Sequence, residues 1–468
     1  YIYNYNFNFS RDNIWYPFKN IIESENWKYS ESLYPVKFFK DLKFYYSPRD
    51  ISFTSTLKDD DSYTLKRELY GGTITDEHNL DLHRNFKTNI HLSDNFSFSY
   101  TIDMKNNLNH LLENNETPSI SDLLDITYSP GLKKNLTEKF SFTYTPELFD
   151  SWLDPRFTYV PTYTWTRDII SGSQPTADLR SDNKFTGNFS FSFQKFIEQF
   201  YTPETTSSSS SKYSSRNRRK SSSSSQTPDT KPFVIDQPHF KTIFKFLHDL
   251  GQRVSSVNIT YIYKINNTFN NVSADIDPDY NFKLGFENKP ADELVSNNLS
   301  TSILSKSNTF DQELRLNTSI QITDNLSLSN MEYRISLSAN RQSDSGYNEN
   351  MSESYFPAGP SGKNGIPIFG WSINLRGLEK YAFLDKWFNS FIVNHSYNGE
   401  KTTISLDDII MKIDYKRNFT PFIGFKMKTK NVPLDINLTY NNILTISNEN
   451  DQIKREISDQ VNLKFDYT

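Results

Sequence analysis

The chain has 468 residues, and its 51 basic and 56 acidic side chains give a net charge of -5, so it lacks the basic excess of a nucleic-acid-binding protein. Cysteine is absent, which excludes disulfides and thiolate metal sites. Aromatic residues make up 15% of a chain whose mean hydropathy is -0.67, and no run approaches the roughly 18 apolar residues of a membrane-spanning helix. The chain starts at Tyr1 without a signal-peptide pattern, which we interpret as a fragment of something longer.

Residues 1–204 are dominated by segments in which aromatic and small polar residues alternate. Asparagines separate aromatic residues between Tyr3 and Phe9, and serines or threonines separate them at 96–100 and again at 140–144. The clearest run ends this region, with Phe189, Phe191 and Phe193 on one side and Ser190 and Ser192 on the other. A period of two predicts β-strands with one apolar and one polar face.

Residues 205–230 form a low-complexity segment of serines with a small basic cluster from Arg216 to Lys220. Such a composition cannot bury a core, so we predict a disordered, solvated loop. Residues 231–468 return to alternation, for example from Val257 to Ile265, from Ile409 to Tyr415 and from Leu434 to Tyr440. We expect one domain containing about 14 to 16 strands, because a tilted membrane strand needs roughly 9 to 11 residues.

Four aromatic segments, most of them with lysines, precede strands: 35–42, 146–153, 240–250 and 378–388. Each can form one to three helical turns with an apolar side, such as Phe240, Phe244 and Leu247. We interpret them as interfacial helices lying against lipid headgroups. For the two shorter segments, 35–42 and 146–153, a strand extension carrying interfacial aromatics is an equal alternative.

The pattern favours an all-β fold, an antiparallel transmembrane β-barrel of which this chain forms a partial arc. Lipid meets one face of such strands and a watery lumen meets the other. We predict Phe189, Phe191 and Phe193 as lipid-facing. The residues predicted to face the lumen are Thr158, Thr162, Thr164, Ser190 and Ser192. Those predicted for the membrane interfaces are Tyr163, Trp165, Trp371, Tyr381 and Trp387, because rings with one polar edge are favoured there.

Several segments resemble the SprA (Sov) family of outer-membrane translocons. The run I-P-I-F-G-W-S-I-N-L-R-G-L-E-K from Ile366, with the following S-F-I-V-N-H-S-Y, is similar to that family's W-x-V-x-W-x-G-L-x-K segment and its S-x-x-x-x-H-x-Y motif. The matching positions are Trp371, Gly377, Leu378, Lys380, His395 and Tyr397, while Leu375 stands where the family commonly has a second Trp. Similar blocks lie at 45–57, 153–193, 418–428 and 437–447, in the family's order.

The resemblance implies the C-terminal part of a giant barrel of the type IX secretion system, linked to gliding motility, that conducts folded proteins across the cell outer membrane. Its implied partners are outer-membrane lipid, secreted cargo with type IX C-terminal signals, and accessory translocon and plug subunits. A different large barrel, of the lipopolysaccharide-assembly or TonB-dependent receptor type, and a soluble β-rich surface protein remain alternatives.

Catalytic chemistry finds little support in the sequence. The only tight cluster of histidines and carboxylates lies between Asp76 and His83, and on a strand His78 and His83 fall on opposite faces. No Gly-rich phosphate loop, G-x-S-x-G or H-E-x-x-H motif occurs. We therefore predict no catalytic, cofactor or metal residues, no cofactor and no enzyme.

Overall fold

The computed structural model describes residues 2–10, 14–15, 44–45, 47–66, 73–109, 131–146, 152–168, 176–201, 238–290, 305–342, 345–449 and 452–467. The predicted segment at 35–42, residues 147–151 of the second segment and the Ser-rich stretch at 205–230 lie outside these residues. Within the described residues the predicted all-β class is confirmed. The fold is one antiparallel sheet of 17 strands and a separate pair of two-residue strands, β2 and β3.

The strands of the first half are β1 (Ile2–Ser10), β2 (Ile14–Trp15), β3 (Phe44–Tyr45), β4 (Asp50–Lys66), β5 (Thr73–Ser93), β6 (Phe96–Asn107), β7 (Leu132–Tyr144), β8 (Leu153–Asp168) and β9 (Thr176–Phe191). Those of the second half are β10 (Val257–Ser273), β11 (Ser305–Gln321), β12 (Leu326–Gln342), β13 (Ser345–Phe356), β14 (Ile366–Pro367), β15 (Gly370–Leu375), β16 (Phe388–Leu406), β17 (Ile409–Thr429), β18 (Leu434–Glu449) and β19 (Gln452–Tyr467). The helices are α5 (Phe193–Glu198), α6 (Pro238–Arg253), α7 (Tyr280–Lys283) and the 3-10 turn η2 (Leu378–Lys380).

The strands pair in a single series. β1 pairs with β4, and each following strand pairs with the next as far as β12. β13 and β15 then share one position, because both pair with β12 on one side and with β16 on the other. The series ends with β17, β18 and β19. Since every pair is antiparallel and β14 pairs only with β13, the sheet has fifteen strand positions and β1 runs in the same direction as β19.

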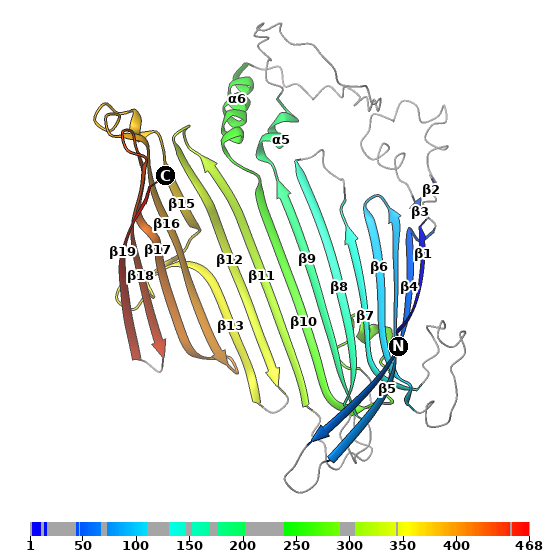
Figure 1. Cartoon of the computed structure of the whole chain (residues 1–468). Helices are drawn as coiled ribbons and strands as arrows, with labels where there is room; N and C mark the ends of the chain where they lie inside the picture. Colours follow the sequence, from blue (N-terminus) through cyan, green and yellow to red (C-terminus); the bar gives the residue numbers. More distant parts are fainter. Residues whose placement is uncertain are drawn as a thin grey trace, which may run out of the picture.

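Figure 1 shows that this sheet bends into an open trough, with β1, β4 and β5 along one side and β16 to β19 along the other. The two ends of the trough differ. At one end, which we call the helix end, lie α5 and α6 between β9 and β10, and η2 between β15 and β16. At the opposite end, which we call the cover end, α7 lies in the connection from β10 to β11.

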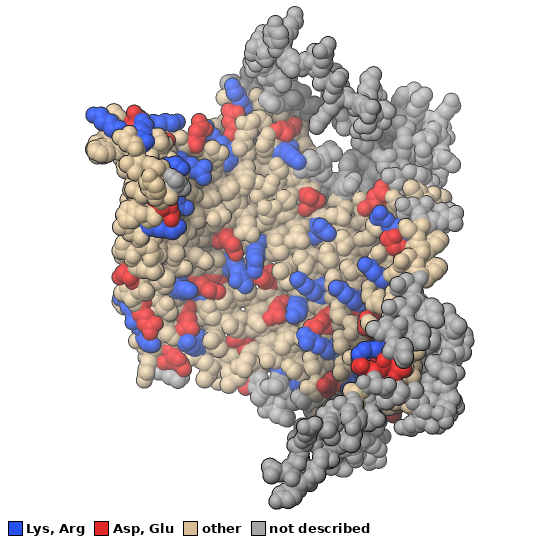
Figure 2. Space-filling model, viewed as in Figure 1, with Lys and Arg blue, Asp and Glu red and all other residues tan. Residues whose placement is uncertain are grey.

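The alternation in the sequence corresponds to two unlike faces. In β9, Phe189 lies beside Pro155 of β8 and Ile259 of β10. The next residue, Ser190, lies beside Asp154 of β8 and Asn258 of β10. Following the registers outward from Phe189 defines the apolar face, and following them from Ser190 defines the polar face. The polar face lines the inside of the trough (Figure 2).

The alternation ends earlier than the sequence suggested. β9 stops at Phe191, and Ser192 is the N-cap of α5, its side chain accepting a hydrogen bond of 3.4 Å from the backbone N–H of Lys195. Phe193 is the first residue of α5 and Ser192 is its N-cap, so neither belongs to the strand on which their predicted faces were based. A serine that can satisfy a free helix N–H favours a helix start at this point, whereas periodicity alone does not detect it.

Candidate functional site: the two faces of the sheet

The apolar face carries a continuous band of aromatic rings near the helix end. From β5 to β10, rings on neighbouring strands lie within 6.4 Å of one another, centroid to centroid. Residues 274–290 reach the edge of this band, where the Tyr280 ring lies 6.4 Å from Phe140 and the Tyr159 phenol donates a hydrogen bond to the Leu284 carbonyl. One series of rings contains Phe86, Tyr100, Phe140, Phe98, Phe142 and Tyr159, and a second contains Tyr144, Phe157, Phe185 and Tyr261. Along β10 the band runs from Val257 to Ile265.

The height of this band can be estimated from strand geometry. The stretch from Val257 to Ile265 covers about 27 Å at ~3.3 Å per residue. At the ~40° tilt of strands in outer-membrane barrels this becomes about 20 Å, comparable with the roughly 25 Å apolar band of such barrels. The apolar band therefore extends over a height close to that of a hydrocarbon layer.

Toward the cover end, the apolar face is buried beneath the chain's own segments. Residues 274–290, which contain α7, pack on this face and contribute Ala274 and Phe282 to a cluster whose members have little or no exposed surface. The other members lie on the strands: Met104, Leu136, Tyr163, Trp165, Ala177, Leu179, Phe269 and Val272. A second cover, formed by the connection 357–365, lies over Tyr355 and Tyr415, and Tyr355 donates a 3.2 Å hydrogen bond to the carbonyl of Lys363. The apolar face is thus bare toward one end and covered toward the other.

An ion group lies beneath the first cover. The Lys283 ammonium of α7 is 3.2 Å from a Glu138 carboxylate oxygen of β7 and 3.3 Å from Asp277, and it also lies 5.2 Å from the Tyr163 ring centre. Burial lowers the pKa of Lys283, but the two carboxylates outweigh this effect and the net pKa is raised. The sequence analysis missed this group, because its members are far apart along the chain.

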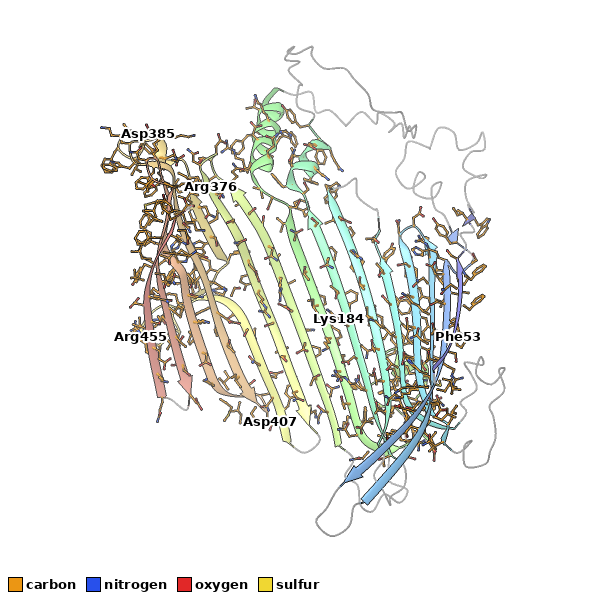
Figure 3. All side chains as sticks on the ribbon, viewed as in Figure 1. Phe53, Lys184, Arg376, Asp385, Asp407 and Arg455 are labelled. Atoms are coloured by element: carbon orange, nitrogen blue, oxygen red, sulfur yellow. The ribbon has the colours of Figure 1, made fainter. Side chains whose placement is uncertain are left out.

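The polar face presents small side chains and neutralised charges. Thr158, Thr162 and Thr164 of β8 share this face with Ser190, because they lie opposite Thr186, Asp182 and Arg180 of β9. Charged residues on this face pair with near neighbours, as in Arg180 with Asp182 at 2.7 Å, Arg334 with Glu313 at 2.5 Å and His83 with Asp103 at 2.8 Å. In Figure 2 positive and negative side chains are intermixed over the inside of the trough, without a patch of one sign. Lys184, also on this face, is labelled near the middle of the trough in Figure 3.

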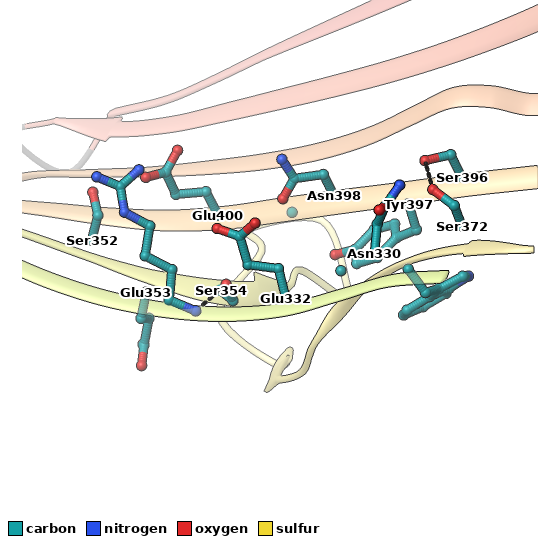
Figure 4. Close-up of a pocket in the computed structure, with 14 residues that line it drawn as sticks. Asn330, Glu332, Ser352, Glu353, Ser354, Ser372, Ser396, Tyr397, Asn398 and Glu400 are labelled. Carbon is teal, nitrogen blue, oxygen red and sulfur yellow. Dashed lines mark hydrogen bonds between the residues drawn. The ribbon is translucent and has the colours of Figure 1, made fainter. Parts of the chain in front are cut away.

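A cavity of about 280 Å³ interrupts the polar face where β13 leaves the sheet and β15 enters it. Figure 4 shows Glu332 and Asn330 of β12 on one side of this cavity, with Asn398 and Glu400 of β16 on the other. The chain between β13 and β15 leaves the sheet and crosses the apolar face. For a short distance no strand therefore lies between β12 and β16. In the sequence, this break is indicated by Pro367 and Gly370, residue types that interrupt strands.

The predicted interface aromatics fall into three groups. Tyr163 and Trp165 have no exposed surface, because residues 274–290 cover them; they pack in a core rather than presenting an edge to an interface. Trp371 is half-buried on the apolar face beside Tyr397, with ring centres 4.4 Å apart. Tyr381 and Trp387, in contrast, are 68% and 64% exposed in the connection at the helix end.

Three further observations concern metal sites, His395 and membrane-spanning helices. Among the described residues, no group of three or more histidines, cysteines or carboxylates could hold a metal ion. The Nδ1–H of His395 donates a 2.6 Å hydrogen bond to the carbonyl oxygen of Phe422. No helix in the described part of the chain is long and apolar enough to cross a membrane.

No protein-family model matches the chain, and no curated protein matches it.

Proposed function

We propose that this chain forms an arc of the wall of a large outer-membrane β-barrel, with the apolar face toward lipid and the polar face toward a water-filled passage. The observation that carries this proposal is the separation of the two faces over the whole sheet, with aromatic rings outside and small or charge-paired residues inside the trough. A strand wall between lipid and water requires this separation, and ring closure satisfies its edge groups.

The strand directions support an arc rather than a ring. Because β1 and β19 run in the same direction, pairing them directly would be parallel. Closing the sheet with antiparallel pairs alone takes an odd number of further strands. A larger ring also encloses a wider lumen, since barrel diameter grows with strand number.

We further propose that the passage conducts folded proteins, as the resemblance to the SprA (Sov) family suggests, in type IX secretion and gliding motility. The polar wall supports this role physically. Short hydroxyl side chains and internally paired charges leave few fixed charges to hold a passing protein surface.

Two experiments, carried out one after the other, test the proposal. The full-length protein is expected in the outer-membrane fraction and to require detergent for extraction; release by salt or carbonate alone would contradict the lipid-facing role. Depletion of the gene is then expected to trap proteins with type IX C-terminal signals in the periplasm, as measured by mass spectrometry of periplasmic and secreted pools. An unchanged distribution would exclude the translocon role and leave a different large barrel.

A further inference from the structure

Two exposed apolar clusters project from the helix end of the sheet. The α6 ridge consists of Ile243, Phe246 and Leu250, which are 53%, 66% and 40% exposed and follow one another along one side of the helix. The η2 cluster consists of Tyr381, Phe383 and Trp387, which are 68%, 78% and 64% exposed. Side chains of this size at such exposure call for a partner surface.

Topology places both clusters at the same end of the strands. The α6 ridge belongs to the connection from β9 to β10, and the η2 cluster to the connection from β15 to β16. β9 and β15 run in the same direction, because an even number of antiparallel steps separates their positions. Figure 1 shows α6 and the connection before β16 at the same edge of the trough.

Ring contacts lead from the apolar face of the sheet to the residues beside each cluster. From Phe191 at the end of β9, rings follow through Phe196 and Phe200 to Phe244 of α6, with centroid distances of 5.9, 5.4 and 6.1 Å. Beside the η2 cluster, Phe388 contacts Phe391 at 5.4 Å, and Phe391 contacts Phe425 at 6.0 Å. Each cluster therefore lies beside rings that continue from the apolar face.

Exposed lysines accompany the apolar side chains. Lys245 lies on α6, and Lys380 and Lys386 flank the η2 cluster. Nearby, Lys430 pairs with Asp385 at 2.7 Å, and its backbone N–H donates a 2.9 Å hydrogen bond to the Trp387 carbonyl, which fixes this connection against the one between β17 and β18. Aromatic and aliphatic side chains beside exposed lysines match the boundary between acyl chains and phosphate headgroups.

We propose that the α6 ridge and the η2 cluster insert into the same lipid leaflet at headgroup level and fix the height at which the sheet sits in the membrane. The occupant is a lipid surface, because both clusters lie beside rings that continue from the face that the proposed function assigns to lipid, and both carry lysines suited to phosphate. The inference rests on the proposed function.

Single labelled cysteines test this directly, since the chain contains none. The full-length protein is reconstituted in vesicles of phosphatidylcholine and phosphatidylglycerol, with lipids brominated either near the headgroup or deep in the acyl chain. A polarity-sensitive fluorophore is attached at Phe246→Cys, Phe383→Cys, Phe189→Cys or Phe286→Cys. Phe286 is the matched control, because it is 71% exposed but lies in the cover segment at the opposite end.

We expect the labels at 246 and 383 to be quenched best by shallow bromines, about 5–10 Å into the headgroup and acyl boundary. The label at 189 should be quenched best by deep bromines, and the label at 286 by neither. Quenching at 189 without quenching at 246 and 383 would overturn the anchor inference, leave the lipid-facing band intact and point to a protein occupant. Absence of quenching at all four positions would overturn the proposed function itself. Equal quenching at 286 and 383 would also overturn the inference, because exposure alone would then explain it.

Discussion

The phenol of Tyr397 donates a 2.7 Å hydrogen bond to the backbone carbonyl of Tyr355, across the point where β13 leaves the sheet. Tyr355 pairs with Pro367 in the small β13–β14 ladder, and proline has no N–H to offer. The Tyr397 side chain therefore satisfies a carbonyl that the strand break would otherwise leave in a buried place. Without this bond, the strand break would leave the Tyr355 carbonyl without a hydrogen-bond donor.

Tyr397→Phe should lower the free energy of unfolding by about 1–3 kcal/mol, because the Tyr355 carbonyl loses its donor while remaining buried. Urea unfolding of the reconstituted protein measures this change. Tyr440→Phe is the matched control, since the Tyr440 phenol bonds Asp459 at an exposed site, and it should change stability by less than about 0.5 kcal/mol. Equal effects of the two substitutions would argue against a special role at the strand break.

Adjacent substitutions in β9 distinguish the two faces. Phe189→Lys places a charge in the aromatic band and should cost about 2–4 kcal/mol if the residue lies near the bilayer midplane. Ser190→Lys, one residue further on the polar face, should cost far less, because its ammonium remains in water. Phe191→Lys at the end of the strand should fall between them, as the cost of a charge decreases toward an interface. Urea titrations in lipid vesicles give the comparison, and similar costs at 189 and 190 would contradict the assigned faces.

Lys283→Met should loosen residues 274–290 from the sheet. The substitution leaves Glu138 buried without its ammonium partner, and breaking a buried ion pair typically costs about 3–5 kcal/mol. Hydrogen exchange of this segment should accelerate while the band from β5 to β9 keeps its protection. Lys289→Met removes an exposed lysine from the same segment and should leave exchange unchanged, and adding Glu138→Gln to Lys283→Met should restore part of the protection.

The same ion group predicts an alkaline limit. The pKa of Lys283 is raised above its ordinary value of 10.5, so the stabilisation is complete below that pH and is lost as the pH rises through the raised pKa. Exchange of residues 274–290, corrected for the intrinsic rate at each pH, should therefore show constant protection between about pH 7 and 9, and lose it only above about 10.5. Lys283→Met should abolish this alkaline transition. Its persistence in that variant would assign it to another group.

Gly251→Ala should separate α6 from α5. A methyl group at this position would lie 2.9 Å from the Cα atom of Gln194, a backbone atom that cannot move aside without shifting α5. Limited proteolysis is expected to cut the α5–α6 region faster in this variant, whereas Gln252→Ala on the exposed side should behave as the native chain. An unaltered cleavage pattern would mean that the two helices adjust without losing contact.

Local sequence determined the strands and their two faces. Alternation is a property of neighbouring residues, so Phe189 and Ser190 could be assigned to opposite faces, and the helical periodicity of residues 240–250 predicted α6. Where a different local signal competes, periodicity predicts too long a strand. This happens at Ser192 and Phe193, where a capping side chain starts a helix. The segment at 378–388 forms the 3-10 turn η2 and then two single helical turns, closed by backbone bonds from Asp385 to Tyr381 and from Phe388 to Leu384.

Contacts between distant segments were decided only by the tertiary structure. Tyr163 and Trp165 look like interfacial aromatics in the sequence, but a segment more than a hundred residues later covers them and makes them core. The Lys283 and Glu138 pair and the cavity between Glu332 and Glu400 likewise join residues with no relationship along the chain. Sequence periodicity sets which way a side chain points from its own strand, whereas what it meets there depends on which segment the fold brings over that face.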